Sequence, residues 1–291
     1  MMSQSGIRRR ALIAFATLLA VSGPALAEEI KPVDTSRLVT VGGAVTEIVF
    51  ALGYGDKVVA RDITSFYPDE VNRLPSVGYM RALSPEGVLS VNPSAILMIQ
   101  GSGPKETIDV LSKASVPLVT IPEGYDRDAL VAKIRAVGKV LGADSKAAEL
   151  AAKVAADVDA AVADAGKIEE GKRRRVLFVM TVQNGKIMAA GQHTAAHGII
   201  ALGGGINATS DFHGYKPLND EAVINARPDV ILLMDTGAQT VSEAEILANP
   251  AVALTPAGQA KKIIRLGGSA LLFGPRTADA IRKVYATLYG G

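Results

Sequence analysis

The chain has 291 residues and no cysteine, with a formal net charge of +2, 21% charged residues and 48% hydrophobic residues. A chain of this length buries a substantial core without disulfides, so a small disulfide-bonded scaffold is excluded. Because the charges are balanced and form no basic patch, we expect no nucleic-acid partner.

The N-terminus has the features of an export signal. Three consecutive arginines at 8–10 precede an apolar run over 11–21, and residues 25–27 form a small-residue cleavage site. The apolar run is too short to span a bilayer. We expect a signal peptide at 1–27, export by the general secretory route rather than the twin-arginine route, and a periplasmic product. Removal of residues 1–27, which carry these three arginines and no acidic residue, leaves 264 residues with a net charge of −1.

Short apolar runs alternate with helical stretches along the rest of the chain, an order typical of βαβ units. We predict an α/β fold of two Rossmann-like lobes with mostly parallel sheets, joined by a long helix. The runs are rich in Val, Ile and Leu, as in strands covered on both faces. Strands are expected at 37–43, 58–62, 95–99 and 118–121 in the first half, and at 176–180, 186–190, 230–234 and 262–266 in the second.

The centre of the chain predicts the long helix. Between 145 and 168 the sequence is rich in Ala and has no Pro, and its first Gly is Gly166. Apolar side chains recur every four residues on one helix face, at Leu150, Val154, Val158 and Val162. We therefore expect an N-terminal lobe at 28–143, a linking helix at 144–170 and a C-terminal lobe at 171–291.

One segment occurs twice, at 86–101 and again 135 residues later at 221–236. Each copy is expected to form a short helix, a turn marked by Pro, and a buried strand. A repeat at about half the chain length implies two lobes that are built alike. A cleft between two such lobes is a common place for a ligand. The identical pairs are Glu86/Glu221, Val88/Val223, Pro93/Pro228, Ile96/Ile231 and Leu97/Leu232.

Tyr79 and Arg81 are the first candidate site residues. Pro75 and Gly78 place Tyr79 on a loop, and residues i and i+2 of an extended segment share a face. A cation beside a phenol favours the phenolate, and Tyr is a known axial ligand of haem iron. A loop Tyr that only packs its ring beside a solvated Arg is the alternative explanation.

The stretch at 77–90 resembles the haem-ligand segment of periplasmic haem-binding proteins that serve ABC importers. Other similar stretches lie at 41–48, 62–68, 214–221 and 273–277, so the resemblance covers nearly the whole mature chain. It implies two Rossmann-like lobes, haem as the cargo, Tyr79 as the axial ligand of ferric haem, and Arg81 as the group that stabilises the tyrosinate. Related binders of cobalamin or ferric siderophores share the fold without the Tyr-x-Arg segment, and they are the alternative.

Glu86 and Glu221 stand at equivalent places in the repeat, so each is expected on the outer surface of one lobe. The resemblance implies that they pair with Arg residues of an ABC transporter permease dimer. An acid in the first turn of a helix, favoured by the helix dipole, is the simpler explanation, and both can hold together. The haem itself is expected to come from a donor at the outer membrane.

The second lobe holds all three histidines, His193, His197 and His213. His193 is a candidate second haem ligand, because some haem-binding relatives hold a second haem on a His of this lobe; a surface His at a helix start is the alternative. Rings of Tyr67 and Tyr215 are candidates to stack on a porphyrin. Arg276 is a candidate partner of a haem propionate, or a cap on Gly-rich backbone.

Enzyme signatures are weak. His193 and His197 have the i, i+4 spacing of metal ligands on a helix, but no Glu follows His193 as in zinc proteases. The glycines at 203–205 lack the spacing of a dinucleotide-binding loop, and no Gly-x-Ser-x-Gly elbow occurs. We expect a binding protein rather than an enzyme, with a secreted metal-dependent enzyme as the least favoured alternative.

Overall fold

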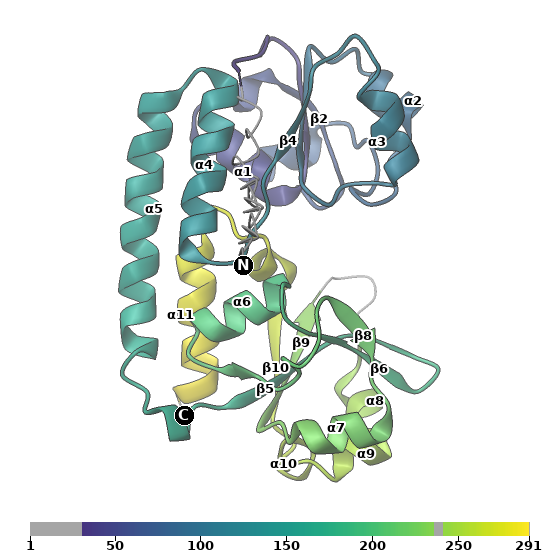
Figure 1. The fold of residues 1–291 in the computed structure, drawn as a ribbon, viewed down its shortest axis with the longest axis vertical. Helices are drawn as coiled ribbons and strands as arrows, with labels where there is room; N and C mark the ends of the chain where they lie inside the picture. The colour runs from purple at the N-terminus through teal and green to yellow at the C-terminus, as the bar shows by residue number, and fades with distance from the viewer. Residues whose placement is uncertain (1–30, 236–240, 291) are drawn as a thin grey trace, which may run out of the picture.

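The computed structural model describes residues 31–235 and 241–290, so the predicted signal peptide at 1–27 lies outside the described residues. Figure 1 shows two lobes, one above the other, with the helices α4, α5 and α11 running along one side. Within the described ranges no helix has the length and apolarity needed to cross a bilayer. The predicted α/β class with two lobes and a long connecting helix is confirmed.

The first lobe is built on a parallel sheet of four strands in the order β2-β1-β3-β4. Both central strands, β1 and β3, are buried at every residue, which explains their almost unbroken apolar sequences. The strands are β1 (Leu38–Val41), β2 (Val58–Arg61), β3 (Ala95–Ile99) and β4 (Leu118–Ile121). The helices are α1 (Gly43–Ala51), α2 (Pro85–Leu89), α3 (Lys105–Leu111) and α4 (Arg127–Leu141), with short 3-10 turns η1 (Gly55–Lys57) and η2 (Asp69–Arg73).

The second lobe holds a mixed sheet in the order β10-β9-β5-β6-β8, with the short β7 paired to β5. Strands β5, β9 and β10 are parallel as predicted, whereas β6 runs antiparallel to both of its neighbours, β5 and β8. Asn184 and Gly185, with φ of 51° and 75°, make the tight turn that reverses the chain between β5 and β6. The strands are β5 (Arg175–Gln183), β6 (Lys186–Ala190), β7 (Ile206–Asn207), β8 (Tyr215–Pro217), β9 (Val230–Asp235) and β10 (Ile263–Gly267).

Helices of the second lobe cover this sheet and close the chain. They are α6 (Ala195–Leu202), α7 (Asp220–Ala226), α8 (Glu243–Ala248), α9 (Pro250–Ala253), α10 (Pro256–Gln259) and α11 (Thr277–Tyr289), with 3-10 turns η3 (Glu170–Lys172) and η4 (Gly268–Leu271). The core of the protein extends from the first lobe into the second, because buried residues of β1 and β3 belong to the same apolar cluster as buried residues of α6 and α11.

The predicted long helix is α5 (Asp144–Ala165), which packs against both α4 and α11. Figure 1 shows the two helices on the same side of α5, α4 along its upper part and α11 along its lower part. Gly142, with a left-handed φ of 64°, ends α4 and lets the chain turn back into α5. At Gly138 the two helices approach so closely that an added Cβ would lie 2.1 Å from the Cβ of Ala147. The helix therefore ties the lobes together along a packed face. The domain boundaries at 143 and 170 stay predictions.

The sequence repeat corresponds to a repeated structure. In the first lobe Ser84 caps α2 by accepting a hydrogen bond from the Gly87 amide at 3.0 Å, and in the second lobe Asn219 caps α7 through the Ala222 amide at 2.8 Å. Each helix leads into a buried strand, β3 or β9, that lies parallel to the first strand of its own lobe. Glu86 and Glu221 occupy the same position of the two short helices, and both side chains are exposed.

Candidate functional site between the lobes

The loop that carries Tyr79 begins at the carboxyl end of β2, the end of a parallel sheet where ligands usually bind. Buried Asp62 anchors the loop start, because its carboxylate accepts hydrogen bonds from the Gly42 amide at 2.8 Å and from the hydroxyl of Ser65 at 2.7 Å. Further along, Gly78 takes a φ of 101°, which a residue with a side chain rarely adopts. The loop is thus fixed at its base and presents Tyr79 outward.

Tyr79 and Arg81 are brought together as the sequence predicted. The Arg81 guanidinium donates a hydrogen bond from Nη1 to the Tyr79 phenol oxygen at 2.9 Å. Tyr79 nevertheless keeps 39% of its surface exposed, so its oxygen remains accessible to a ligand. A hydrogen bond donated by a cation makes the phenol oxygen an acceptor. Such an oxygen is suited to bind a hard, electron-poor centre such as ferric iron.

Phenols of both lobes influence the pKa of Arg81. Burial, the largest single effect, lowers the pKa of Arg81, but the hydrogen bond to Tyr79 and the nearby phenols of Tyr79, Tyr125 and Tyr215 together raise it above its ordinary value. Tyr215 starts β8 of the second lobe, whereas Arg81 belongs to the first. Burial in turn raises the pKa of Tyr215. The Arg81 guanidinium and the Tyr215 phenol, one from each lobe, are thus close enough to influence each other electrostatically.

Several large apolar side chains of the loop that carries Tyr79, and one side chain of β8, remain exposed. Of the seven large hydrophobic side chains in the described residues that are strongly exposed, four come from the loop after β2 and one from β8. Exposed aromatic rings of this kind are costly in water and mark a surface that takes a ligand or partner. The five side chains are Ile63, Phe66, Tyr67, Tyr79 and Tyr215.

Arg276 lies against Tyr67 but is already engaged. Its guanidinium carbon lies 3.5 Å from the centroid of the Tyr67 ring. Its Nε and Nη2 donate to the two carboxylate oxygens of buried Glu47 at 3.1 and 2.9 Å. Arg276 precedes α11 and Glu47 lies on α1, so this ion pair connects the two ends of the chain. The structure therefore places Arg276 beside the site with a carboxylate partner of its own.

The three histidines form a loose group in the second lobe. The rings of His193 and His213, both exposed, stack with centroids 4.6 Å apart. His193 precedes the cap of α6 in a left-handed conformation, with φ of 56°, and so lies off the face of His197. Burial, with a smaller effect of His193, lowers the pKa of His197. Within 31–235 and 241–290, no group of three or more His, Cys, Asp or Glu side chains is arranged to hold a metal ion.

Two further residues at the site were missed by the sequence analysis. Tyr125, after β4, packs edge-on against Phe273 at 5.4 Å, and burial raises its pKa to about 12, so its hydroxyl stays protonated. Glu47 was missed because an acid inside an apolar helix gives no sign of its partner. Tyr125 had one usable signal, since it follows the carboxyl end of a predicted strand, as Tyr79 does.

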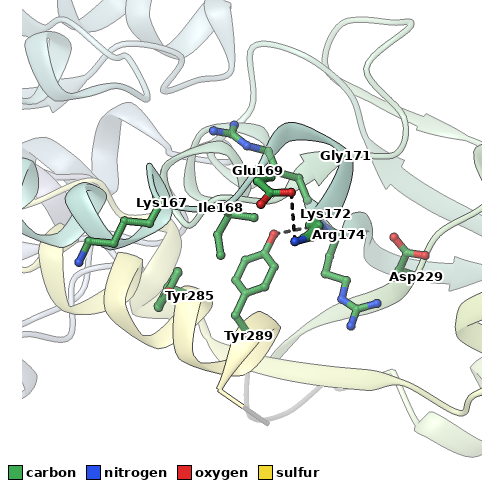
Figure 2. Close-up of a pocket in the computed structure, with 10 residues that line it drawn as sticks. Lys167, Ile168, Glu169, Gly171, Lys172, Arg174, Asp229, Tyr285 and Tyr289 are labelled. Carbon is green, nitrogen blue, oxygen red and sulfur yellow. Dashed lines mark hydrogen bonds and ion pairs between the residues drawn. The ribbon is translucent and has the colours of Figure 1, made fainter.

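A separate hollow of about 620 Å³ lies where α5 and α11 end, away from these residues. Figure 2 shows Tyr285 and Tyr289 from α11 on one side of it. The charges around it are partly paired, with Lys172 and Glu169 at 3.0 Å, and the Tyr289 hydroxyl accepts from the Arg174 amide at 3.0 Å. None of the predicted site residues lines this hollow.

A solved structure closely resembles this fold. The periplasmic haem-binding protein RhuT from Roseiflexus sp. RS-1, in its apo form, superposes with a TM-score of 0.81 and is 38% identical. The match covers 88% of this chain and 98% of RhuT. The two proteins therefore share their fold over most of this chain and nearly all of RhuT.

Relatives by sequence are more distant. The uncharacterized ABC transporter substrate-binding lipoprotein YvrC of Bacillus subtilis (strain 168) is 27% identical over 204 residues, a match that covers 69% of this chain and 64% of YvrC, less than two thirds of its length. The vitamin B12-binding protein of Yersinia pestis (strain Pestoides F) is 24% identical over 204 residues, covering 70% of this chain and 71% of that protein. The model of the periplasmic binding protein family matches residues 38–270. The chain thus belongs to the periplasmic binding protein family, the substrate-binding proteins of ABC transporters, which bind solutes and are not enzymes.

Proposed function

We propose that this protein is a periplasmic carrier that captures haem between its two lobes and delivers it to an ABC importer. The observation that carries the proposal is the hydrogen bond of 2.9 Å from Arg81 to Tyr79 on an exposed loop. Tyrosine binds haem iron through its phenol oxygen. A phenol oxygen that accepts a hydrogen bond from a neighbouring Arg is suited to this role. The similarity to RhuT, a haem-binding protein, supports the choice of cargo.

In this function Tyr79 binds the haem iron through its phenol oxygen, and Arg81 stabilises the negative charge of that oxygen. Hydrogen bonds to charged groups contribute about 1.5–3 kcal/mol. Removing the Arg81 guanidinium therefore weakens haem binding by about 10- to 100-fold. Since an anionic oxygen ligand prefers ferric iron, reduction of the haem loosens the hold of the protein on it.

The exposed side chains around Tyr79 supply the walls for the porphyrin. Ile63 and Phe66 extend from the same loop as Tyr67, and Tyr215 faces Arg81 from the second lobe. Flat apolar ligands bind best in sites that are mostly apolar and aromatic, with few polar groups. His193, stacked on His213, is our candidate for a second iron ligand on the lobe-two side.

Delivery requires a docking surface on both lobes. Exposed Glu86 and Glu221 stand at the same position of α2 and α7, so a permease dimer with two-fold symmetry meets one acid on each lobe. Charge pairs at the rim of such an interface mainly raise the association rate and fix the register. The energy for transport comes from the importer, and an outer-membrane donor supplies the haem.

Titration of the mature protein with hemin, followed by absorbance, tests the proposal. We expect a saturable Soret band with the spectrum of a high-spin tyrosinate complex, lost in both Tyr79→Ala and Tyr79→Phe. Tyr285→Phe on α11 is the matched control, because it removes the same hydroxyl from a Tyr outside the site. A wild-type protein that gives no saturable band contradicts haem as the cargo. A band that survives both Tyr79 variants contradicts Tyr79 as the ligand.

Cobalamin is the second candidate cargo, favoured by the similarity to the B12-binding protein. Titration with cyanocobalamin in a calorimeter separates the two candidates. A saturable heat of binding for cyanocobalamin that is unchanged in Tyr79→Phe, together with no response to hemin, establishes cobalamin as the cargo in place of haem. Binding of a ferric siderophore is tested by a titration in which quenching of tyrosine fluorescence is followed.

A further inference from the structure

Glu47 and Arg276 form the best-defined polar contact between the two ends of the chain. The Glu47 side chain is only 4% exposed, and it accepts from Arg276 Nε at 3.1 Å and Nη2 at 2.9 Å. The backbone amide of Arg276 adds a third hydrogen bond to the same carboxylate, at 3.2 Å. A planar guanidinium that spans both carboxylate oxygens is held in one orientation.

This fixed guanidinium lies on one face of the Tyr67 ring. Its central carbon is 3.5 Å from the ring centroid, which is the geometry of a close cation–π contact. Tyr67 still exposes 40% of its surface, so part of the ring remains free on the ligand side. The Glu47–Arg276 pair therefore supports one face of the Tyr67 ring and determines the position of that ring.

The same geometry argues against Arg276 as a partner of a haem carboxylate. Two of its three nitrogens already donate to Glu47, and the buried Glu47 carboxylate neutralises its charge. A second carboxylate placed on Arg276 would approach the Glu47 anion and be repelled by it.

We propose that Arg276 is a positioning residue: held by Glu47, it fixes the Tyr67 ring as the platform on which a flat cargo stacks, and it does not bind the cargo's carboxylates. This inference rests on the proposed function for the identity of the cargo. An aromatic platform of this kind contributes about 0.5–1.5 kcal/mol to stacking, which corresponds to about 2- to 10-fold in affinity.

Hemin and haem dimethyl ester, which has no free carboxylates, distinguish a positioning role from a direct contact. We expect Arg276→Gln to weaken the binding of both by the same factor, about 2- to 10-fold. In a Tyr67→Ala background the Arg276→Gln change should have no further effect. A loss seen with hemin but not with the ester, or a loss that persists without Tyr67, overturns the inference. Arg282→Gln, on the exposed face of α11, controls for the removal of one positive charge.

Fluorine NMR tests the same inference without any cargo. The chain has 7 Tyr, so 3-fluorotyrosine gives a small set of resonances in which Tyr67 is assigned by Tyr67→Phe. We expect Arg276→Gln and Arg276→Lys to shift and narrow the Tyr67 resonance, because a lysine ammonium cannot span both Glu47 oxygens. An unchanged resonance in both variants overturns the inference. A wild-type protein that binds no hemin overturns the proposed function instead, while this measurement still decides the role of Arg276. Far-UV CD checks that each variant is folded.

Discussion

Lys133 offers a sharp test of how the two lobes are held together. Its side chain on α4 is completely buried, and its ammonium pairs with Glu123 and donates to the carbonyl of Phe273 at 3.2 Å. The Glu123 side chain is 22% exposed, so the two partners of the ion pair have different access to water. Burial lowers the pKa of Lys133, and the attraction of Glu123 only partly opposes this effect.

The two ways of breaking this pair should therefore have unequal costs. Lys133→Met keeps most of the apolar stem and removes a charge whose burial is unfavourable, while Glu123 regains water. The main loss is the hydrogen bond to Phe273, about 1 kcal/mol, so we expect the free energy of unfolding to change by about 1 kcal/mol or less. Glu123→Ala instead leaves a buried ammonium without its counter-ion, which typically costs about 3–5 kcal/mol.

Urea unfolding at neutral pH, followed by far-UV CD, measures both variants. The double variant Lys133→Met/Glu123→Ala is the control, because it has no buried charge to strand and should be more stable than Glu123→Ala alone. Equal losses for the two single variants would refute the reasoning. A Lys133→Met variant that is less stable than Glu123→Ala would refute it as well. Both results would mean that the Lys133–Glu123 ion pair stabilises the protein by more than the burial of its charges costs.

Three further predictions concern other parts of the molecule. Gly138→Ala places a Cβ 2.1 Å from that of Ala147 and should lower the unfolding free energy by about 1–3 kcal/mol in urea. Tyr79→Ala, at an exposed position, should change it by only about 0.5 kcal/mol. The pKa of His197 is lowered from 6.5, chiefly by burial, so the folded protein binds fewer protons than the unfolded chain just below that value. The stability of the wild-type protein should therefore fall as the pH drops through this range, and the stability of His197→Gln should fall less. Thermal unfolding at several pH values measures both. An equal pH dependence of the melting temperature in the two proteins would contradict His197 as the origin of the effect.

Much of the fold could be predicted because the deciding signals are local. Parallel strands buried on both faces need unbroken apolar runs, and β3 and β9 have them within the repeated segments. The long helix α5 follows from an Ala-rich stretch with a single stripe. Strand β6 was predicted at 186–190, but its antiparallel direction and the existence of β8 were not anticipated. The Asn184–Gly185 turn was their one clear sign, while β8 is a three-residue strand with no buried face.

In the candidate site, too, contacts between residues close in sequence could be predicted, whereas contacts between distant residues could not. Tyr79 and Arg81 are two residues apart, so an extended loop was enough to predict that they meet. Glu47 and Arg276 are separated by 229 residues, and only the packing of α1 against the end of the second lobe brings them together. No composition or spacing rule reports such a pair. The sequence-based prediction of a propionate role for Arg276 could not take Glu47 into account, because the sequence does not show that the two residues are paired.

The junction between the lobes and the wall of the site share one segment, and this has a kinetic consequence. Phe273 packs on Tyr125 and accepts a hydrogen bond from Lys133. Three residues later, Arg276 is held by Glu47 and lies against the Tyr67 ring. Separating the lobes at this segment must break the ion pair and free the Tyr67 ring at the same moment. Stacking of the Tyr67 ring on the cargo is made only in the bound state, so weakening it mainly raises the dissociation rate.

We therefore expect Glu47→Gln to release hemin about 2- to 10-fold faster with little change in association. The amide of Gln turns one acceptor into a donor that faces the Arg276 nitrogens, so the guanidinium loses its fixed orientation. Transfer of hemin to an excess of apomyoglobin, followed in a stopped-flow instrument, measures the dissociation rate. Glu243→Gln, an exposed acid of α8 in the second lobe, is the matched control. Identical release rates for Glu47→Gln and the wild type would mean that the junction holds the lobes without acting on the cargo.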